Sequence, residues 1–330
     1  MANLTLLDHA RIVDPNGKIG KVVELFTQNN AVLEDMVFIE GNLPTGHRSI
    51  IRTGLPAVTW RRLYKGVQPS KSTTKPVDDT AGMLEGYSVV DQSLADLNGN
   101  AKAWRLSEDE SFIESMNQEV SQNTFYGNVG TDAERFTGLA PRYGNISTDK
   151  KLSGYNVISG GGAGDDNTSV WLVGWGESTI AGFYPKGSQL GIKVSDHGLV
   201  TVNDDQGNPF EAYRTHFKWD LGLMVRDWRY ASRLANIDVS NLGGSSAVDL
   251  ISNMLKMRTK IPNLRKVRPV YYCNAEVMAA LMTQMLNKSN VFLTLRDLTG
   301  PNGIVSPVLH FLDIPVKQCD AIGNAETLVS

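Results

Sequence analysis

The chain has 330 residues, of which 41% are hydrophobic and 20% charged, a composition typical of a globular protein with one large or two modest domains. Its 32 basic and 35 acidic residues leave a net charge of −3, which argues against a dedicated nucleic-acid binder. No apolar run approaches the roughly 18 residues of a membrane span, so we expect no membrane association.

The N-terminal sequence lacks the basic-then-apolar pattern of a signal peptide. Two cysteines, Cys273 and Cys319, indicate a reducing compartment and no disulfide framework. A turn at 14–17 precedes a predicted helix over Lys18–Asn29. Because chain ends fray unless they are tied down, we expect both ends to be docked and no maturation protease to shorten the chain.

The segment 41–92 is rich in Arg, Lys, Thr, Gly and Pro and does not resemble core. Strand-like runs at 47–54 and 83–91 flank its middle, which predicts a two-stranded arm with its tip near Pro69–Pro76. Two strands with little apolar surface do not offset their own ordering entropy. We therefore expect a neighbouring subunit to cover the arm.

One long helix is predicted over Ser107–Tyr126. Ser107 and Glu110 have the spacing of a capping box, and Gly127 follows as a C-cap. Apolar or small side chains fall on a single stripe: Phe112, Ile113, Met116, Val120 and Thr124. By itself this pattern indicates an amphipathic core helix of roughly 30 Å.

After the helix, a short loop leads to Phe136–Leu139, with the sequence FTGL. A charged arm, a long helix and this loop, in that order, resemble the major capsid proteins of tailed bacteriophages of the Hong Kong 97 type. The resemblance implies an α+β, Hong Kong 97-like (HK97-like) fold. In that family these pieces are the extended loop, the spine helix and the start of the adjacent sheet, and the residues before them form an N-terminal arm.

The middle of the chain is predicted to be mainly strands. The Gly-rich stretch 156–168 lacks both the Walker Lys-Ser/Thr and the dinucleotide spacing, so it is interpreted as a surface loop. Val170–Trp175 is a continuous apolar run, typical of a strand buried on both faces. Leu199–Val202 leads into the turn 203–209, whose carboxylates lack the EF-hand spacing. Tyr213–Val225 alternates with period two and predicts a strand of about 43 Å.

The last part of the chain is predicted to be an α/β unit. Ser246 is expected to cap a helix that ends before Pro262, and Arg268–Cys273 to form a strand. Asn274 is expected to cap a second helix, whose methionines are interpreted as core filler. In the family, such a strand and helix followed by a final Ile314–Val316 look like the axial domain.

An enzyme is not favoured, and no catalytic, cofactor-binding or metal-ligating residue is expected. No two of the five histidines have metal-type spacing, and neither cysteine lies in a catalytic signature: His9, His47, His197, His216 and His310 are scattered along the chain. The family's self-crosslinking would need a Lys on the extended loop. Lys65, Lys71 and Lys75 lie there, but no matching Asn-Glu signature is present, so crosslinking is not expected.

The resemblance implies a major capsid protein of a tailed double-stranded DNA bacteriophage. Copies would assemble as pentamers and hexamers into an icosahedral head in the host cytoplasm, and scaffolding, portal and cement proteins would be partners. Packaged DNA would be contacted weakly and without sequence preference. The alternatives are an encapsulin-type nanocompartment and, less favoured, a soluble enzyme.

The expected domains follow the order of the family. They are an N-terminal arm 1–40, an extended loop 41–92, the spine helix and start of the peripheral domain 93–150, peripheral strands 151–240, and an axial domain 241–330.

The order of the strands departs from the usual family pattern, in which the long strands beside the spine helix follow the axial domain. Here they precede it, which predicts a permuted topology. Tyr213–Val225 should then lie along the helix, and Ile314–Ile322 should lie beside Val267–Cys273. A single sheet containing both Tyr213–Val225 and Val267–Cys273 would contradict the permutation.

Overall fold

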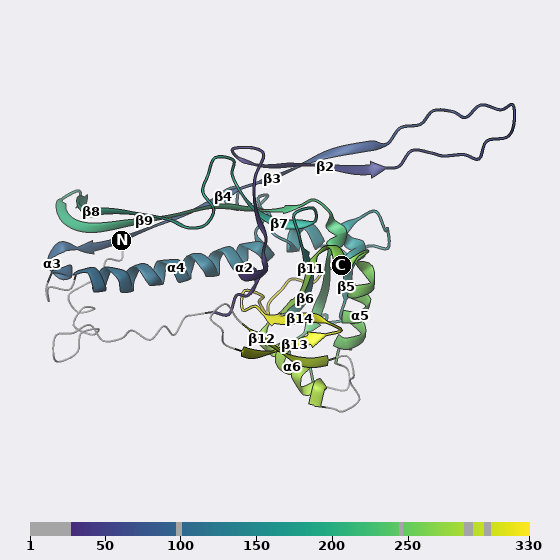
Figure 1. Cartoon of the computed structure of the whole chain (residues 1–330). Helices are drawn as coiled ribbons and strands as arrows, with labels where there is room; N and C mark the ends of the chain where they lie inside the picture. Colours follow the sequence, from purple (N-terminus) through teal and green to yellow (C-terminus); the bar gives the residue numbers. More distant parts are fainter. Residues whose placement is uncertain (1–27, 97–100, 244–246, 287–292, 300–304) are drawn as a thin grey trace.

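The computed structural model describes residues 28–96, 101–243, 247–286, 293–299 and 305–330. The chain forms three parts, a long wing, a body and a two-stranded arm (Figure 1). The wing and the arm project in opposite directions from the region where both join the body. Such an extended shape leaves much surface that the chain cannot cover by itself.

The wing is built around helix α4, Ala101–Tyr126, which begins six residues before the predicted start. Ser107 lies inside this helix, so the predicted capping box is wrong. The residues from Ala101 to Leu106 include good helix formers and no Gly or Pro, so nothing in them stops the helix from extending upstream. At about 1.5 Å per residue the helix is about 39 Å long.

Two strands pack on α4, β4 (Gly82–Asp91) and β9 (Pro209–Val225), and β8 (Lys193–Asn203) extends the same sheet by pairing with β9. The predicted stripe faces this sheet, with Met116 and Val120 buried and Phe112 stacked on Phe217 at a centroid distance of 5.7 Å. At the other end of the helix, Trp104 is buried in a small cluster of its own. The wing therefore has its own apolar contacts from end to end.

Strand β9 has 17 residues, and its pairing partner and its burial change along its length. Its residues from Ala212 to Leu221 pair with β4, and their burial alternates with period two only from Arg214 to Leu221, a shorter stretch than the predicted Tyr213–Val225. Its last four residues, Gly222–Val225, pair instead with β7 (Ile180–Tyr184) and are buried on both faces. One strand thus spans from the wing into the body.

This continuity decides the question of strand order. As predicted, β9 lies along α4, and β14 (Ile314–Gln318) pairs with β11 (Arg268–Cys273). However, one sheet of twelve strands among the described residues contains both β9 and β11. Eight of its strands follow one another in the order β12 (Leu293–Thr299), β13 (Val305–Phe311), β14, β11, β6 (Asn167–Trp175), β7, β9 and β4, and the other four pair with strands of this series or with one another. The prediction of a permuted topology is therefore wrong by its own criterion, because β9 is long enough to pair with different neighbours at its two ends.

The body surrounds β6, Asn167–Trp175, in which every residue is buried, as the apolar run predicted. Helix α5, Leu250–Lys260, is capped by Asp249, whose Oδ1 accepts from the Ser252 amide at 3.0 Å. Ser246, the predicted cap, lies outside the described residues. Helix α6, Ala275–Leu286, is capped by Asn274 as predicted, with Oδ1 accepting from the Val277 amide at 3.0 Å.

The remaining elements complete the sheet and its connections. They are α2 Val32–Asp35, β1 Phe38–Glu40, α3 Gln92–Ala95, η1 Ala140–Tyr143, η2 Ser153–Asn156, β5 Val157–Ser159, η3 Trp228–Tyr230, β10 Ala231–Asp238, η4 Leu264–Lys266, β12 Leu293–Thr299 and β13 Val305–Phe311. Because β5 forms within the Gly-rich stretch, the loop itself is shorter than predicted. The predicted helix 18–29 lies outside the described residues except for Gln28 and Asn29, which are not helical.

The arm consists of β2 (Gly46–Gly54) and β3 (Thr73–Thr80), joined by the tip, residues 55–72. The prediction that 47–54 and 83–91 flank the arm is correct only for the first run, since 83–91 belongs to β4 and pairs with β9. The strand that pairs with β2 in the arm is β3. Its sequence contains Pro76 and two aspartates, residues that are typical of loops, so it was not predicted as a strand. Proline is tolerated here because a two-stranded ribbon has only edge strands.

Candidate functional site

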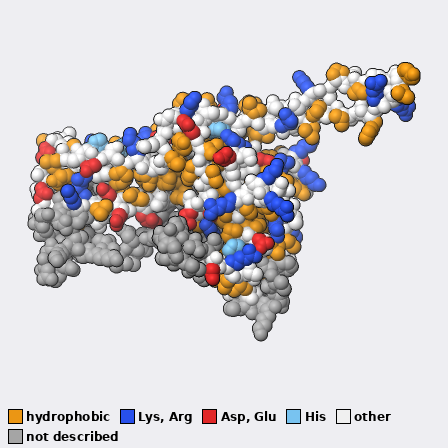
Figure 2. Space-filling view, viewed as in Figure 1, with side chains coloured by type: hydrophobic (Ala, Val, Ile, Leu, Met, Phe, Trp, Pro, Cys, Tyr) orange, Lys and Arg blue, Asp and Glu red, His pale blue; other side chains and the backbone are white. Residues whose placement is uncertain are grey.

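The tip of the arm exposes large apolar side chains. Trp60 and Tyr64 are fully exposed, and Leu55 is 83% exposed. The arm carries six basic residues and no acidic residue from Ser49 to Val77: Arg52, Arg61, Arg62, Lys65, Lys71 and Lys75. Figure 2 shows these two kinds of side chain side by side along the arm. A monomer rarely exposes such a mixed surface without a partner for it.

The base of the arm, in contrast, is fixed to the body by a buried carboxylate. Asp79 on β3 accepts from Arg142 Nη2 at 2.7 Å and from the Val225 amide at 3.3 Å, and its side chain is only 2% exposed. Gly46 on β2 approaches the same place so closely that a Cβ would lie 2.3 Å from the Asp79 carbonyl oxygen. The base of the arm therefore has a defined direction, and the arm projects away from the body beyond it (Figure 1).

His47 completes this attachment from the opposite strand. Its ring packs against Phe183 at a centroid distance of 5.9 Å, and its Nε2 lies 3.0 Å from Arg226 Nη2. Since a guanidinium can only donate, Nε2 is the acceptor and the neutral ring carries its proton on Nδ1. Burial lowers the pKa of His47, and the neighbouring Arg226 lowers it further, while Asp79 opposes both. His47 is therefore neutral at neutral pH.

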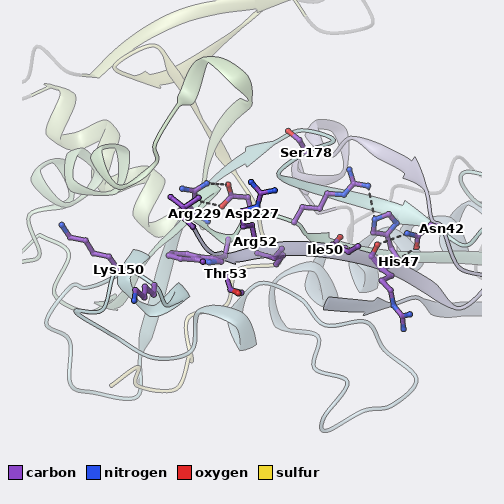
Figure 3. Close-up of a pocket in the computed structure, with 17 residues that line it drawn as sticks. Asn42, His47, Ile50, Arg52, Thr53, Lys150, Ser178, Asp227 and Arg229 are labelled. Carbon is purple, nitrogen blue, oxygen red and sulfur yellow. Dashed lines mark hydrogen bonds and ion pairs between the residues drawn. The ribbon is translucent and has the colours of Figure 1, made fainter. Parts of the chain in front are cut away.

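A cavity of about 1120 Å³, which we call the root cavity, opens beside these residues (Figure 3). It is larger than the roughly 300–1,000 Å³ of small-ligand pockets. Six basic residues line it: Arg48, Arg52, Lys150, Lys151, Arg226 and Arg229. Asp227 is the acidic residue of its lining, and it is already bound by Arg229 at 2.7 Å. The cavity wall is therefore strongly cationic.

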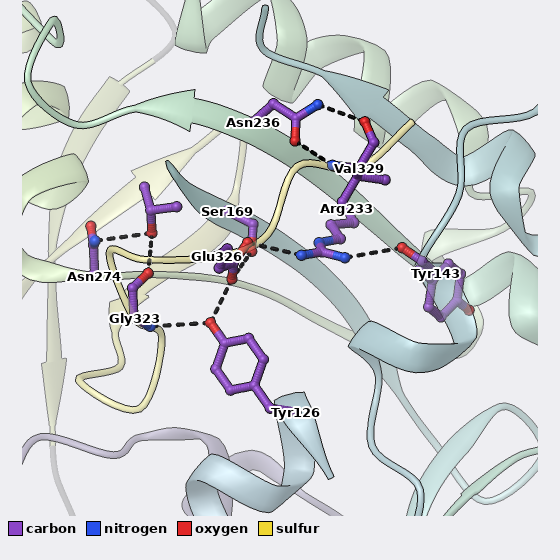
Figure 4. A network of polar contacts seen from close by, with 10 residues as sticks. Tyr126, Tyr143, Ser169, Arg233, Asn236, Asn274, Gly323, Glu326 and Val329 are labelled. Atoms are coloured by element: carbon purple, nitrogen blue, oxygen red, sulfur yellow. Dashed lines mark hydrogen bonds and ion pairs between the residues drawn. The ribbon is translucent and has the colours of Figure 1, made fainter. Parts of the chain in front are cut away.

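A second polar network ties the C-terminal segment to the body (Figure 4). Glu326 binds Arg233 at 2.8 Å, and both side chains are about 95% buried, with 5% and 4% exposed. The same carboxylate accepts from Tyr126 at the end of α4, at 2.5 Å, and from Ser169 on β6, at 2.7 Å. Burial and Glu326 both raise the pKa of Tyr126. This network holds the spine helix, the sheet and the chain end together.

The groups that could carry catalysis do not converge. No cluster of three His, Cys, Asp or Glu residues with the geometry of a metal site occurs among the described residues. Burial raises the pKa of both thiols, that of Cys319 to about 12, so neither is a reactive thiolate at neutral pH. His216 lies on the wing, stacked on Tyr87 at 4.3 Å. In the part of the chain that the structure describes, no helix is long and apolar enough to cross a membrane.

Sequence reasoning located the arm but not its base. The base depends on Asp79, Arg142, His47 and Arg226, which lie far apart in the chain and form no motif. Lys65, Lys71 and Lys75 lie on the arm as predicted, and all three are at least partly exposed. The one sequence feature that could have indicated the base is Gly46 at the start of a strand, because a glycine there is typical of a close approach between two backbones.

Comparison with known proteins identifies the family. The family model "Major capsid protein GP7" matches residues 14–330. A chain of the solved structure of bacteriophage Epsilon15 is 35% identical, with a TM-score of 0.77, and the match covers 100% of this chain and 98% of that one. Among curated proteins, none matches.

One more distant structure, a phage capsid, shares the fold. The capsid of bacteriophage JBD30 matches with a TM-score of 0.53 at 8% identity, over 90% of this chain and 92% of that one. An encapsulin of Synechococcus elongatus PCC 7942 matches with a TM-score of 0.43 at 10% identity, over 72% and 97%. The family match therefore favours a phage shell over the encapsulin alternative. The chain belongs to the family of GP7 major capsid proteins: it is a structural component of a tailed-phage capsid and not an enzyme.

Proposed function

We propose that copies of this chain assemble as pentamers and hexamers into a closed icosahedral head around double-stranded DNA, and that each arm lies across a neighbouring copy. The observation that carries this proposal is the arm tip, where Trp60 and Tyr64 are fully exposed while the base is fixed by Asp79. A fixed base with an uncovered apolar tip fits a segment that is ordered by a second subunit.

The domains of the family are assigned on the same basis. The arm, formed by β2, the tip and β3, corresponds to the extended loop. The wing corresponds to the peripheral domain, and its helix α4 to the spine helix. The α/β body around β11, α5 and α6 corresponds to the axial domain, and the residues before 41 to the N-terminal arm. Scaffolding, portal and cement proteins are further expected partners, supported by the family resemblance alone.

The test is to replace the tip, residues 55–72, by a short Gly-Ser turn. These residues contribute nothing to the apolar clusters of the described chain, so the subunit should fold with an unchanged melting temperature. Particles should be lost, as measured by sedimentation and electron microscopy. A large drop in the melting temperature with intact particles would contradict the proposal.

Point variants sharpen this experiment. Trp60→Ala combined with Tyr64→Ala should reduce particle yield, because these two side chains have the largest uncovered apolar surface on the tip. Leu255→Ala, at a 41% exposed position on α5, is the matched control and should leave the yield unchanged. Equal effects of the two changes would indicate a general loss of solubility instead of a lost contact.

A further inference from the structure

The root cavity contains donors that lack acceptors. His47 Nδ1 and Ser49 Oγ are both buried without a hydrogen-bond partner, and both residues line the cavity and are less than 7% exposed. Because Nε2 of His47 accepts from Arg226, its Nδ1 is a donor. Buried polar groups are nearly always satisfied, so these two atoms are exceptions in the wall of the cavity.

The cations of the cavity also lack partners of opposite charge. Arg48 and Arg229 are bound by Asp78 and Asp227, respectively, but no ion pair is formed by Arg52, Lys150 or Lys151 within the described chain. The apolar part of the lining consists of Ile50, Ile51, Leu55 and Trp228. Cations together with apolar side chains in a recess fit an acidic peptide segment. Duplex DNA, in contrast, is bound through its phosphates on an open basic surface.

We propose that the root cavity receives the β8–β9 turn, residues 203–208, of a second copy of this chain, with Asp204 and Asp205 as the acidic groups. This inference rests on the proposed assembly and names a second contact within it. The turn carries two carboxylates and no basic residue, and all six of its residues are exposed. Its charge is therefore complementary to the lining of the cavity.

The turn is also preformed. The Oδ1 of Asp204 accepts from the amides of Gln206 and Asn208, both at 2.8 Å, and Gly207 adopts a positive φ of 87° that closes the hairpin. A segment that is already ordered loses little conformational entropy when it binds. The cavity volume of about 1120 Å³ suits a peptide turn better than a single small anion.

The shape of the molecule makes the contact possible. The β8–β9 turn lies at the far end of the wing, and the arm leaves the body in the opposite direction (Figure 1). A second copy placed head-to-tail beneath the arm would therefore direct the end of its wing towards the root cavity. The two surfaces are different, so the interface is heterologous, and a rotation that closes it generates a ring.

The first experiment traps the contact by disulfide formation. The full chain carrying both Lys151→Cys and Asp205→Cys is assembled, oxidised and analysed on a denaturing, non-reducing gel. We expect a ladder of linked subunits, and we expect no ladder from the matched control with Lys266→Cys and Asp205→Cys, since Lys266 is exposed outside the cavity. The two native thiols are buried and do not compete.

The second experiment reverses charge. Lys150→Glu with Lys151→Glu should reduce particle yield at least tenfold, and adding Asp205→Lys should restore part of it. Both lysines are exposed, so the subunit should fold, and its melting temperature is the check. Particles that form from the double-cysteine chain without a ladder would overturn this inference and leave the proposed assembly intact. Failure of the unmodified chain to form particles would instead overturn the proposed assembly.

Discussion

At the scale of single residues, the buried ion pair of Arg233 and Glu326 joins the C-terminal segment to the body. Desolvation of two charges offsets much of their attraction, so the pair adds little stability compared with two apolar residues. Removing one partner, however, leaves the other charge buried without compensation. The guanidinium also lies 5.0 Å above the Trp171 ring and donates to the Tyr143 carbonyl, so it cannot turn towards solvent.

We therefore predict that Glu326→Gln destabilises the subunit by about 3–5 kcal/mol. The measurement is urea unfolding of the unassembled protein. Asp313→Asn is the control, because its pair with Arg296 is more than half exposed and should contribute less than about 1 kcal/mol. If both variants lost the same free energy of unfolding, the burial of Glu326 would not explain its effect on stability.

His47 predicts a pH dependence of stability. Its pKa in the folded chain lies below its ordinary value of 6.5, so between the two values the unfolded chain binds more protons. Stability is then complete above about pH 6.5 and is lost progressively as the pH falls towards the lower, folded-state pKa. His47→Gln should reduce this loss as the pH falls below about 6.5, and His197→Gln, at an exposed position, is the control. Unfolding curves at several pH values provide the comparison.

At the scale of elements, the sequence predicted those whose own pattern is strong. The apolar run of β6, the long strand β9 and the Asn274 cap of α6 are local signals, and all three elements are confirmed, with the alternation of β9 ending at Leu221. The pairing of β2 with β3 was not predictable, because β3 has few apolar residues and its register is set by contacts at Asp79. The first six residues of α4 were not predicted, because the capping pattern at Ser107 indicated a helix start there, whereas the residues upstream are themselves good helix formers.

A close backbone approach at the end of α4 gives a prediction at this scale. A Cβ on Gly138 would lie 2.5 Å from the Asn123 carbonyl oxygen and 2.7 Å from that of Thr124. Gly138→Ala should therefore force the loop away from the helix and destabilise the subunit by about 1–3 kcal/mol. Gly66→Ala is the matched control, since its new methyl group meets nothing within 4 Å. Thermal unfolding of both variants measures the difference.

At the scale of the whole molecule, charge is divided between the parts. The arm is basic, whereas α4 carries five acidic residues and no Lys or Arg from Ser107 onward: Glu108, Asp109, Glu110, Glu114 and Glu119. Although the net charge is only −3, basic residues are concentrated in the arm and acidic residues in α4. This separation of charge favours contacts between the arm of one copy and an acidic part of its neighbour. An acidic spine gives DNA no phosphate contact.

Isolated subunits should accordingly bind duplex DNA weakly and without sequence preference. Any binding should come from the arm and should disappear near about 200 mM salt, because counterion release drives it. Fluorescence anisotropy with two unrelated duplexes measures this, and the variant without residues 55–72 should bind more weakly still. Binding that persists at that salt and discriminates between the duplexes would contradict the prediction.

The position of Glu326 has a consequence for how the subunit unfolds. One carboxylate accepts from Arg233 and Ser169 in the body and from Tyr126 at the end of α4. Because the same group holds the helix of the wing and the sheet of the body, loss of either contact weakens the other. The wing and the body should therefore unfold in a single transition and not one after the other.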